Sequence, residues 1–183
     1  MNTKQELIHA LSIYTSKYEV EAAFSKRFLS LLENENAFQR THLPGHITGS
    51  AWICNEDFSK VILVHHAKLN RWLQPGGHAD GDENIIQVAL KETEEETGIK
   101  HYSILAESIF DLDIHRIPER KDMPAHDHYD IRILVQATDK QEIVVSEESH
   151  DVKWFALDEV KNLTDEQSVL RMVEKTKLLR TNQ

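Results

Sequence analysis

The segment from Gly76 to Ile99, GGHADGDENIIQVALKETEEETGI, constrains the fold of this chain more than any other segment. We expect a helix to end at Gly98, because glycine accepts the positive φ of a C′ residue. We expect Asp82 to be the N-cap of the same helix. The helix between them has one flank that we expect to be buried, because apolar side chains recur there at helical spacing. The residues on this flank are Ile85, Ile86, Ala89, Leu90 and Thr93.

Three glutamates lie close together on the predicted helix. Glu92, Glu95 and Glu96 stand at positions i, i+3 and i+4, within an arc of about 100° at the edge of the buried flank. Glu94 lies almost on the opposite side of the helix from these three glutamates. Like charges at these spacings destabilise an isolated helix by about 0.2–0.5 kcal/mol per pair, and the single ammonium of Lys91 cannot neutralise three carboxylates. Clustered carboxylate oxygens favour a hard divalent ion such as Mg²⁺ or Mn²⁺, and the alternative is a solvated acidic face.

Composition sets limits on the class of protein. The 183 residues fit one ordinary domain with a short helical extension. The chain has 31 acidic and 21 basic residues, which give a formal net charge of −10 and argue against an extended nucleic-acid surface. Cys54 is the single cysteine, so neither an internal disulfide framework nor a cysteine zinc knuckle is expected.

The first residues, MNTKQELIHALSIYTSKY, lack the apolar core of a signal peptide, and no run of apolar residues reaches membrane-spanning length. These features predict a cytoplasmic protein without a membrane partner.

The periodicity of the remaining chain predicts a mixed sheet between helices. Two helices are expected within residues 3–34, broken near residues 15–17, and a last helix is expected at 165–179. Residues 68–82 are predicted to form a loop. Strands are expected at 45–54, 60–66, 103–115, 128–138, 142–145 and 154–157.

The spacing of residues from Gly77 to Ile99, called the box below, resembles the signature of the Nudix hydrolases. Gly77 is followed after five residues by Glu83 and after seven more by KETEEETGI, so both glycines and all four glutamates of G-x5-E-x7-R-E-U-x-E-E-x-G-U match. The resemblance implies an α/β (α+β) fold, a Nudix-like α/β/α sandwich with a mixed sheet, in residues 43–183. Residues 1–42 would then form an N-terminal helical extension of the same unit.

Two positions depart from the signature. Lys91 stands where the family usually has arginine, so a bidentate ion pair becomes a single-point contact. Thr93 replaces the apolar residue on the buried flank, at some cost in packing. Neither change removes a metal ligand.

The resemblance implies the chemistry of the site. Glu92, Glu95 and Glu96 would bind Mg²⁺ or Mn²⁺, the backbone carbonyl of Gly76 would be a further ligand, and Glu83 would support the loop or an outer metal shell. The ions would neutralise charge on the diphosphate while a water attacks one phosphorus.

The resemblance leaves the general base open, because in this family it varies between helix and loop. Glu148 in VSEESHDVKW is the loop candidate, with Glu147 beside it, and Glu92 is the helix candidate. The alternative is that both loop residues are exposed carboxylates without a catalytic role.

Other residues are weaker candidates for binding substrate. Trp72 could stack on a base or pack beneath the loop, His78 could meet a phosphate or fill the loop, and Arg132 could hold substrate charge or lie at the surface. His126 and His128 share one side of a strand, with Asp130 two residues further on. That spacing suits a transition metal or a phosphate as well as a structural role.

Three function classes follow. The first is a metal-dependent hydrolase that cleaves a diphosphate bond in a nucleoside diphosphate linked to another moiety, which makes a small nucleotide derivative the expected partner. The second is a non-catalytic nucleotide sensor, which retention of the glutamates disfavours. The third is a prenyl-diphosphate isomerase, for which Cys54 lies in the wrong part of the chain. Residues 1–42 could cap the pocket, form a homodimer or stabilise the sheet.

Overall fold

The computed structural model describes residues 1–106, 108–120 and 123–181. The chain forms two compact units, each built from three segments. The first unit comprises Met1–Ser50, Gly76–Ala89 and Ala106–Ile133, and the second comprises Ala51–Pro75, Leu90–Leu105 and Leu134–Gln183.

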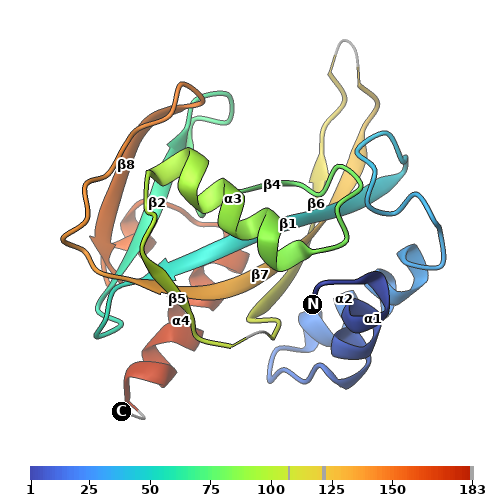
Figure 1. Cartoon of the computed structure of the whole chain (residues 1–183), viewed down its shortest axis with the longest axis horizontal. Helices are drawn as coiled ribbons and strands as arrows, with labels where there is room; N and C mark the ends of the chain where they lie inside the picture. The colour runs from blue at the N-terminus through green and yellow to red at the C-terminus, as the bar shows by residue number, and fades with distance from the viewer. Residues whose placement is uncertain (107, 121–122, 182–183) are drawn as a thin grey trace. The chain divides into compact units, whose positions relative to one another are not determined.

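Two helices begin the first unit, as predicted: α1 (Lys4–Ile13) and α2 (Glu19–Leu31) lie side by side (Figure 1). Leu7 and Phe28 supply fully buried side chains, one from each helix. The buried carboxylate of Glu21 on α2 accepts a hydrogen bond from the backbone N–H of Leu112 at 3.0 Å. A buried carboxylate without partners would carry a large desolvation cost, so this hydrogen bond is favourable. It joins the helix pair to the sheet.

The sheet of the first unit contains the start of β1 (Gly45–Cys54), β4 (Gly76–His78), β6 (Asp111–Ile117) and most of β7 (His126–Ala137). β4 pairs antiparallel with β1, and β6 pairs antiparallel with β7 along its whole length.

The second unit contains β2 (Lys60–His66), β3 (Arg71–Leu73), β5 (Tyr102–Ile104) and β8 (Ser149–Ala156). β2 lies between β3 and β8 and is antiparallel to both, and Figure 1 shows β2 and β8 side by side. β5 pairs with the end of β7.

Helix α3 (Ile85–Thr97) begins in the first unit and ends in the second, and α4 (Gln167–Thr181) follows a short 3₁₀ helix, Val160–Asn162. Within the second unit, the indole Nε1 of Trp52 donates a hydrogen bond to Thr176 Oγ1 at 2.8 Å. Both side chains are fully buried, so the indole N–H would have no hydrogen-bond partner without this bond.

Hydrogen bonds join the strands in the order β3-β2-β1-β7-β5, with β4 beside β1, β6 beside β7 and β8 beside β2. The prediction of an α+β fold with a mixed sheet is confirmed. The predicted helices and the strands at 45–54 and 60–66 are also confirmed.

Four local predictions were wrong. The stretch 68–82 is not all loop, because β3 and β4 lie within it. Residues 142–145 form no strand, since the N–H of Val144 is bonded instead to the carbonyl of Thr97. Residues 105–110, predicted as part of a strand, lie outside β5 and β6, and Glu107 is outside the described residues.

The N-cap of α3 is the fourth correction. The backbone N–H of Gln87 donates to Asn84 Oδ1 at 3.1 Å, whereas Asp82 Oδ1 accepts from the N–H of Asn84. Asn84 therefore occupies the N-cap position, and Asp82 forms an Asx turn just before it.

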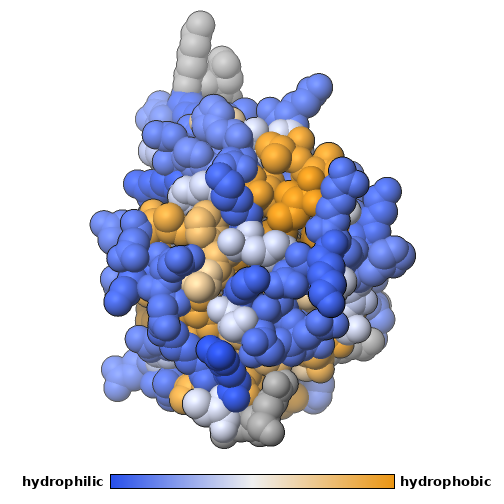
Figure 2. Space-filling model, turned by 90° about the vertical axis from the view of Figure 1, so that its left-hand side faces the viewer, coloured by the Kyte–Doolittle hydropathy of each residue, from blue (hydrophilic) through white to orange (hydrophobic). Residues whose placement is uncertain are grey.

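Hydrophilic side chains cover most of the face drawn in Figure 2, and hydrophobic side chains gather in a few separate areas of it. Scattered exposure of apolar side chains is usual for a folded chain. None of the helices in the described ranges is long and apolar enough to span a bilayer.

We predict that Thr176→Val lowers the free energy of unfolding by about 1–3 kcal/mol, because it leaves the buried Trp52 N–H without an acceptor. Urea unfolding at equilibrium measures this change. Thr181→Val on the same helix is the control, since Thr181 is exposed and its loss should change stability by less than about 0.5 kcal/mol. Equal effects of the two substitutions would contradict the role of the Trp52 bond.

Candidate functional site

Helix α3 has a fully buried stripe that sets the direction of its glutamates. Ile85, Ala89, Thr93 and Thr97, at intervals of four residues, are all 0% exposed. Glu92 and Glu96 each precede a residue of this stripe, and both are half-buried. A fixed buried side therefore holds these two carboxylates at its edge, where water solvates them only partly.

Glu94 and Glu95 lie in different environments. Glu94 accepts a hydrogen bond from the hydroxyl of Tyr102 on β5 at 2.9 Å, and burial together with this bond raises the pKa of Tyr102 to about 12. Glu95 is exposed, and its carboxylate lies 3.7 Å from Lys91 Nζ. An exposed pair of this kind stabilises a helix by only about 0.3–0.5 kcal/mol.

The C-terminal end of α3 is fixed by a close backbone contact. Gly98 has a φ of +75°, and its N–H bonds the carbonyl of Glu94 at 3.0 Å, as the predicted C′ residue should. A Cβ at this position would lie 2.7 Å from Val144 Cβ. Thr93, which departs from the signature, is buried, and its carbonyl accepts from Thr97 Oγ1 at 2.6 Å.

Gly76 lies on β4 opposite Ser50 of β1. A Cβ on Gly76 would lie 2.7 Å from Ser50 Cβ and 2.9 Å from its Cα, closer than real Cβ atoms approach. Ser50 cannot move aside easily, because its hydroxyl donates to Asp130 Oδ1 at 2.6 Å. Glycine is therefore required for β4 to pair with β1 here.

Glu83 has a partner that the sequence did not reveal. Its Oε2 accepts a hydrogen bond at 2.9 Å from the backbone N–H of Lys4, the first residue of α1. The first N–H groups of a helix have no partner within the helix, and a carboxylate there also interacts favourably with the helix dipole. Glu83 thus ties the box to the N-terminal helices.

Arg132 is not at the surface. It is 3% exposed, and its guanidinium forms ion pairs with Asp111 at 3.1 Å, Asp113 at 3.3 Å and Asp130 at 2.8 Å. Burial acts to lower the pKa of Arg132, but the three carboxylates together raise it above its ordinary value. The surface alternative for Arg132 therefore does not hold, and the guanidinium holds β6 against β7.

Glu147 and Glu148 are both exposed on the loop before β8. The backbone carbonyl of Glu148 accepts from the N–H of Ala67 at 3.0 Å, which fixes the loop against the residue that follows β2. Glu148 is therefore anchored by its backbone while its side chain stays accessible.

Trp72 on β3 is half-buried between other rings. His65 stacks on it, with ring centroids 4.9 Å apart and planes 15° apart, and Phe155 contacts it edge-on at 4.8 Å. The aromatic-packing alternative accounts for these contacts.

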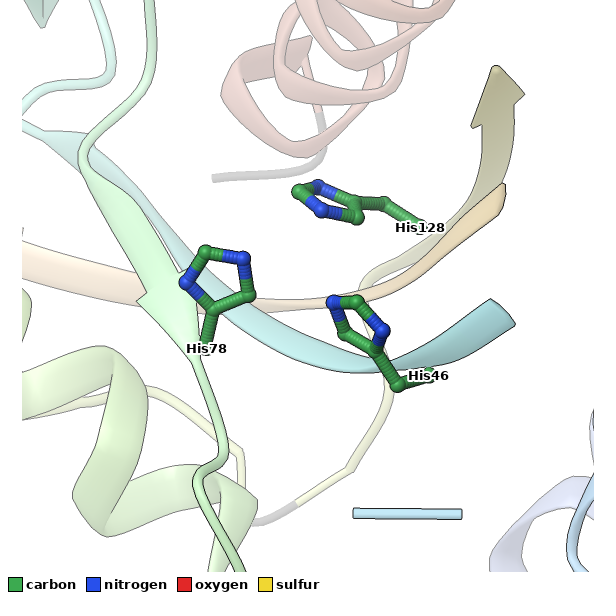
Figure 3. Close-up of side chains that lie close together, drawn as sticks. All are labelled: His46, His78 and His128. Carbon is green, nitrogen blue, oxygen red and sulfur yellow. The ribbon is translucent and has the colours of Figure 1, made fainter. Parts of the chain in front are cut away.

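His78 on β4 meets two other histidines, His46 on β1 and His128 on β7, and Figure 3 shows the three rings close together. One ring nitrogen of each lies within 4.8 Å of the others. Burial lowers the pKa of His46 to about 4 and that of His128 to about 2, and it also lowers the pKa of His78, so all three rings are neutral near pH 7.

Part of this cluster escaped the sequence analysis. Asp130 does not join the histidines, because it accepts hydrogen bonds from Thr48 and Ser50 and pairs with Arg132. His46 was missed, since it lies far from His78 and His128 in sequence and follows a strand-opening glycine without any motif.

Cys54 is a core residue, as predicted. Its side chain is 0% exposed, and burial raises the pKa of the thiol to about 12. A thiol in this state is a poor nucleophile at neutral pH, which disfavours the isomerase alternative.

Comparison with known proteins gives consistent matches. A family model described as NUDIX domain matches residues 45–175. The asymmetrical bis(5'-nucleosyl)-tetraphosphatase of Rattus norvegicus is 32% identical over 110 residues, which cover 60% of this chain and 71% of the rat protein. A probable DHNTP pyrophosphohydrolase of Lactococcus lactis subsp. cremoris is 28% identical over 119 residues, or 63% of this chain and 69% of that protein.

The fold is also similar to that of a C. elegans Ap4A hydrolase solved as a binary complex, with a TM-score of 0.61 and 18% sequence identity. The similarity covers 75% of this chain and 98% of the solved chain.

We predict that Arg132→Met lowers the free energy of unfolding by about 3–5 kcal/mol, because it leaves buried carboxylates without their counterion. Arg116→Met is the matched control. Arg116 pairs with Asp127 at 3.0 Å but is exposed, so its loss should cost no more than about 1 kcal/mol in the same urea titration. A loss at Arg132 as small as that at Arg116 would show that the buried pairs do not hold the strands.

Proposed function

The chain belongs to the NUDIX domain family, and on this premise we propose that it is a divalent-metal-dependent hydrolase of a nucleoside diphosphate linked to another moiety. Its relatives are named as enzymes that split phosphoric anhydrides, and the chain is a pyrophosphohydrolase of the same kind. One observation carries the finer proposal: the helix of the matching box presents Glu92, Glu95 and Glu96 along one side of a buried stripe.

The donor set fits Mg²⁺ or Mn²⁺. These ions prefer carboxylate oxygens, and they keep several waters that phosphate oxygens of a substrate can replace. Glu92 and Glu96 are half-buried, so their mutual repulsion is screened less than it would be in bulk water. Divalent ions, when bound by these side chains, would supply positive charge for the diphosphate and lower the pKa of an attacking water.

Gly76 and Glu83 have supporting roles in this proposal. The carbonyl of Gly76 is proposed as a further metal ligand, and the tight pairing of β4 with Ser50 would hold that carbonyl in a fixed direction. Glu83 would act as a support of the box through its bond to the N–H of Lys4, rather than as a ligand.

We assign the general base to Glu148. Its loop backbone is anchored at Ala67 while its carboxylate is exposed, so the side chain is free to take the proton of the attacking water. Glu147 and Glu92 are the alternatives. His78 and Trp72 remain proposed substrate contacts, although each already has aromatic neighbours.

The proposed substrate is a dinucleoside polyphosphate, because the most similar relative named above is a bis(5'-nucleosyl)-tetraphosphatase. A pterin or nucleoside triphosphate is the second candidate, which the Lactococcus relative favours at slightly lower identity.

We place the catalytic domain at residues 43–183 and treat residues 1–42 as an extension that stabilises it. The hydrogen bonds of Lys4 to Glu83 and of Glu21 to Leu112 support this assignment. A homodimer and a cytoplasmic location stay predictions.

The experiment that tests the proposed function is hydrolysis of diadenosine tetraphosphate with Mg²⁺ or Mn²⁺, run beside dihydroneopterin triphosphate, ADP-ribose and nucleotide sugars. We expect metal-dependent turnover, with label from ¹⁸O-water in one phosphate product. Tight nucleotide binding without turnover of any compound would favour the sensor alternative instead.

We predict that Glu92→Gln, Glu95→Gln and Glu96→Gln each lower kcat/KM by at least about 10²-fold, since each removes a negative oxygen donor for the metal. Glu94→Gln is the control. It lies on the same helix, but its carboxylate bonds Tyr102, so activity should fall less than about threefold. Loss of activity in Glu94→Gln equal to that of the other three would contradict the assignment.

We predict that Glu148→Gln lowers kcat by about 10²–10⁴-fold with little change in metal affinity, as expected for loss of a general base. Glu147→Gln, which alters the neighbouring exposed carboxylate, should keep near-normal kcat. The pH dependence of kcat in both variants is the measurement. If Glu147→Gln is the slower enzyme, the base is Glu147, and if neither is slow the helix candidate Glu92 takes its place.

A further inference from the structure

A cluster of imidazoles in the first unit lies on three different strands. His46 comes from β1, His78 from β4 and His128 from β7, and Figure 3 shows the rings grouped around a common space. One nitrogen from each ring lies within 4.8 Å of the other two. Pairs of these ring centroids are 4.9–5.2 Å apart. Neutral histidine nitrogens are ligands of zinc and related transition metals, whereas Mg²⁺ prefers oxygen.

His46 provides a second, independent sign of a ligand. Its ring is 0% exposed, and Nε2 has no hydrogen-bond partner among the described residues. Nδ1 lies 3.3 Å from the carbonyl of His42, which can only accept, so Nδ1 carries the proton and Nε2 offers a lone pair. A buried polar atom without a partner is costly, and a metal ion would satisfy it.

His126 shows the same arrangement beside the cluster. Its Nδ1 donates to the carbonyl of Pro124 at 2.8 Å, which leaves a lone pair on Nε2. That Nε2 lies 3.3 Å from Nε2 of His128. With the lone pair on His126 Nε2, this contact is a hydrogen bond donated by the Nε2–H of His128, which leaves the lone pair of His128 on Nδ1. His126 therefore neighbours the three clustered histidines and is not one of them.

The surroundings suit a bound metal with fixed ligand tautomers. Histidine ligands in metal sites usually donate their second ring N–H to a carbonyl or a carboxylate, and the bond of His46 to His42 is of this kind. Zn–N bonds of about 2.0–2.1 Å in tetrahedral geometry place two ligand nitrogens about 3.4 Å apart, so a bound ion would draw these three nitrogens, now within 4.8 Å of one another, closer together.

We propose that His46, His78 and His128 form a transition-metal site of the Zn²⁺ class, separate in ligand chemistry from the carboxylates of α3. The ion would link β4 to β1 and β7. Since β4 contributes only three residues, Gly76–His78, it gains more from such a link than a longer strand would. This inference goes beyond the proposed hydrolase function and does not depend on it.

The test is a titration of the chelator-treated 183-residue chain with ZnCl₂, in which calorimetry measures binding. Excess Mg²⁺ is present throughout, so that sites made of oxygen ligands are already filled. We expect one equivalent of Zn²⁺ to bind and to raise the thermal unfolding temperature. His128→Gln and His78→Gln should weaken Zn²⁺ binding by more than the roughly 10–100-fold cost of removing an outer-shell partner. Two variants serve as controls: His101→Gln, which alters an exposed histidine, and Glu96→Gln, which alters a carboxylate of α3. Both should bind Zn²⁺ like the original chain.

A second readout separates coordination from folding. Co²⁺ in place of Zn²⁺ should give the visible absorption of a nitrogen-coordinated, low-symmetry ion in the original chain and not in His78→Gln. His78 is only half-buried, so this variant is expected to fold even if His128→Gln does not, and circular dichroism checks both. Unchanged Zn²⁺ binding in a folded His78→Gln, or loss of binding in Glu96→Gln, would overturn the proposal.

Discussion

The constraint on which the rest of the structure depends is the fixed rotation of helix α3. Four fully buried residues at intervals of four, from Ile85 to Thr97, allow the helix only one orientation about its axis. Asn84 caps its first turn, and Gly98 ends it against Val144. The half-buried carboxylates of Glu92 and Glu96 are therefore held at the edge of the buried stripe, and under the proposed function this position favours binding of a divalent cation.

The local features of the sequence predicted most of this helix correctly. Helical periodicity gave the buried stripe, and the steric freedom of glycine gave its end at Gly98. The cap was misplaced by two residues, because both Asp82 and Asn84 are good capping residues and the sequence alone does not separate them. The stretch 142–145 has strand propensity, but its backbone is used to hold the end of α3 instead.

The features that the sequence could not predict all depend on contacts between distant residues. The sequence left Arg132 open between holding substrate charge and lying at the surface, and the structure buries it among three aspartates from β6 and β7. Glu83 belongs to the box signature, but its bond to Lys4 spans 79 residues. His46 joins His78 and His128 only because β1, β4 and β7 meet in one sheet, and single-sequence spacing contains no signal for that register.

The measurement that tests the central claim most directly is anomalous diffraction from crystals of the full-length chain soaked in MnCl₂. The account predicts manganese peaks in direct contact with carboxylate oxygens of Glu92, Glu95 and Glu96. Crystals in which manganese occupies other positions while these three side chains point separately into solvent would contradict it.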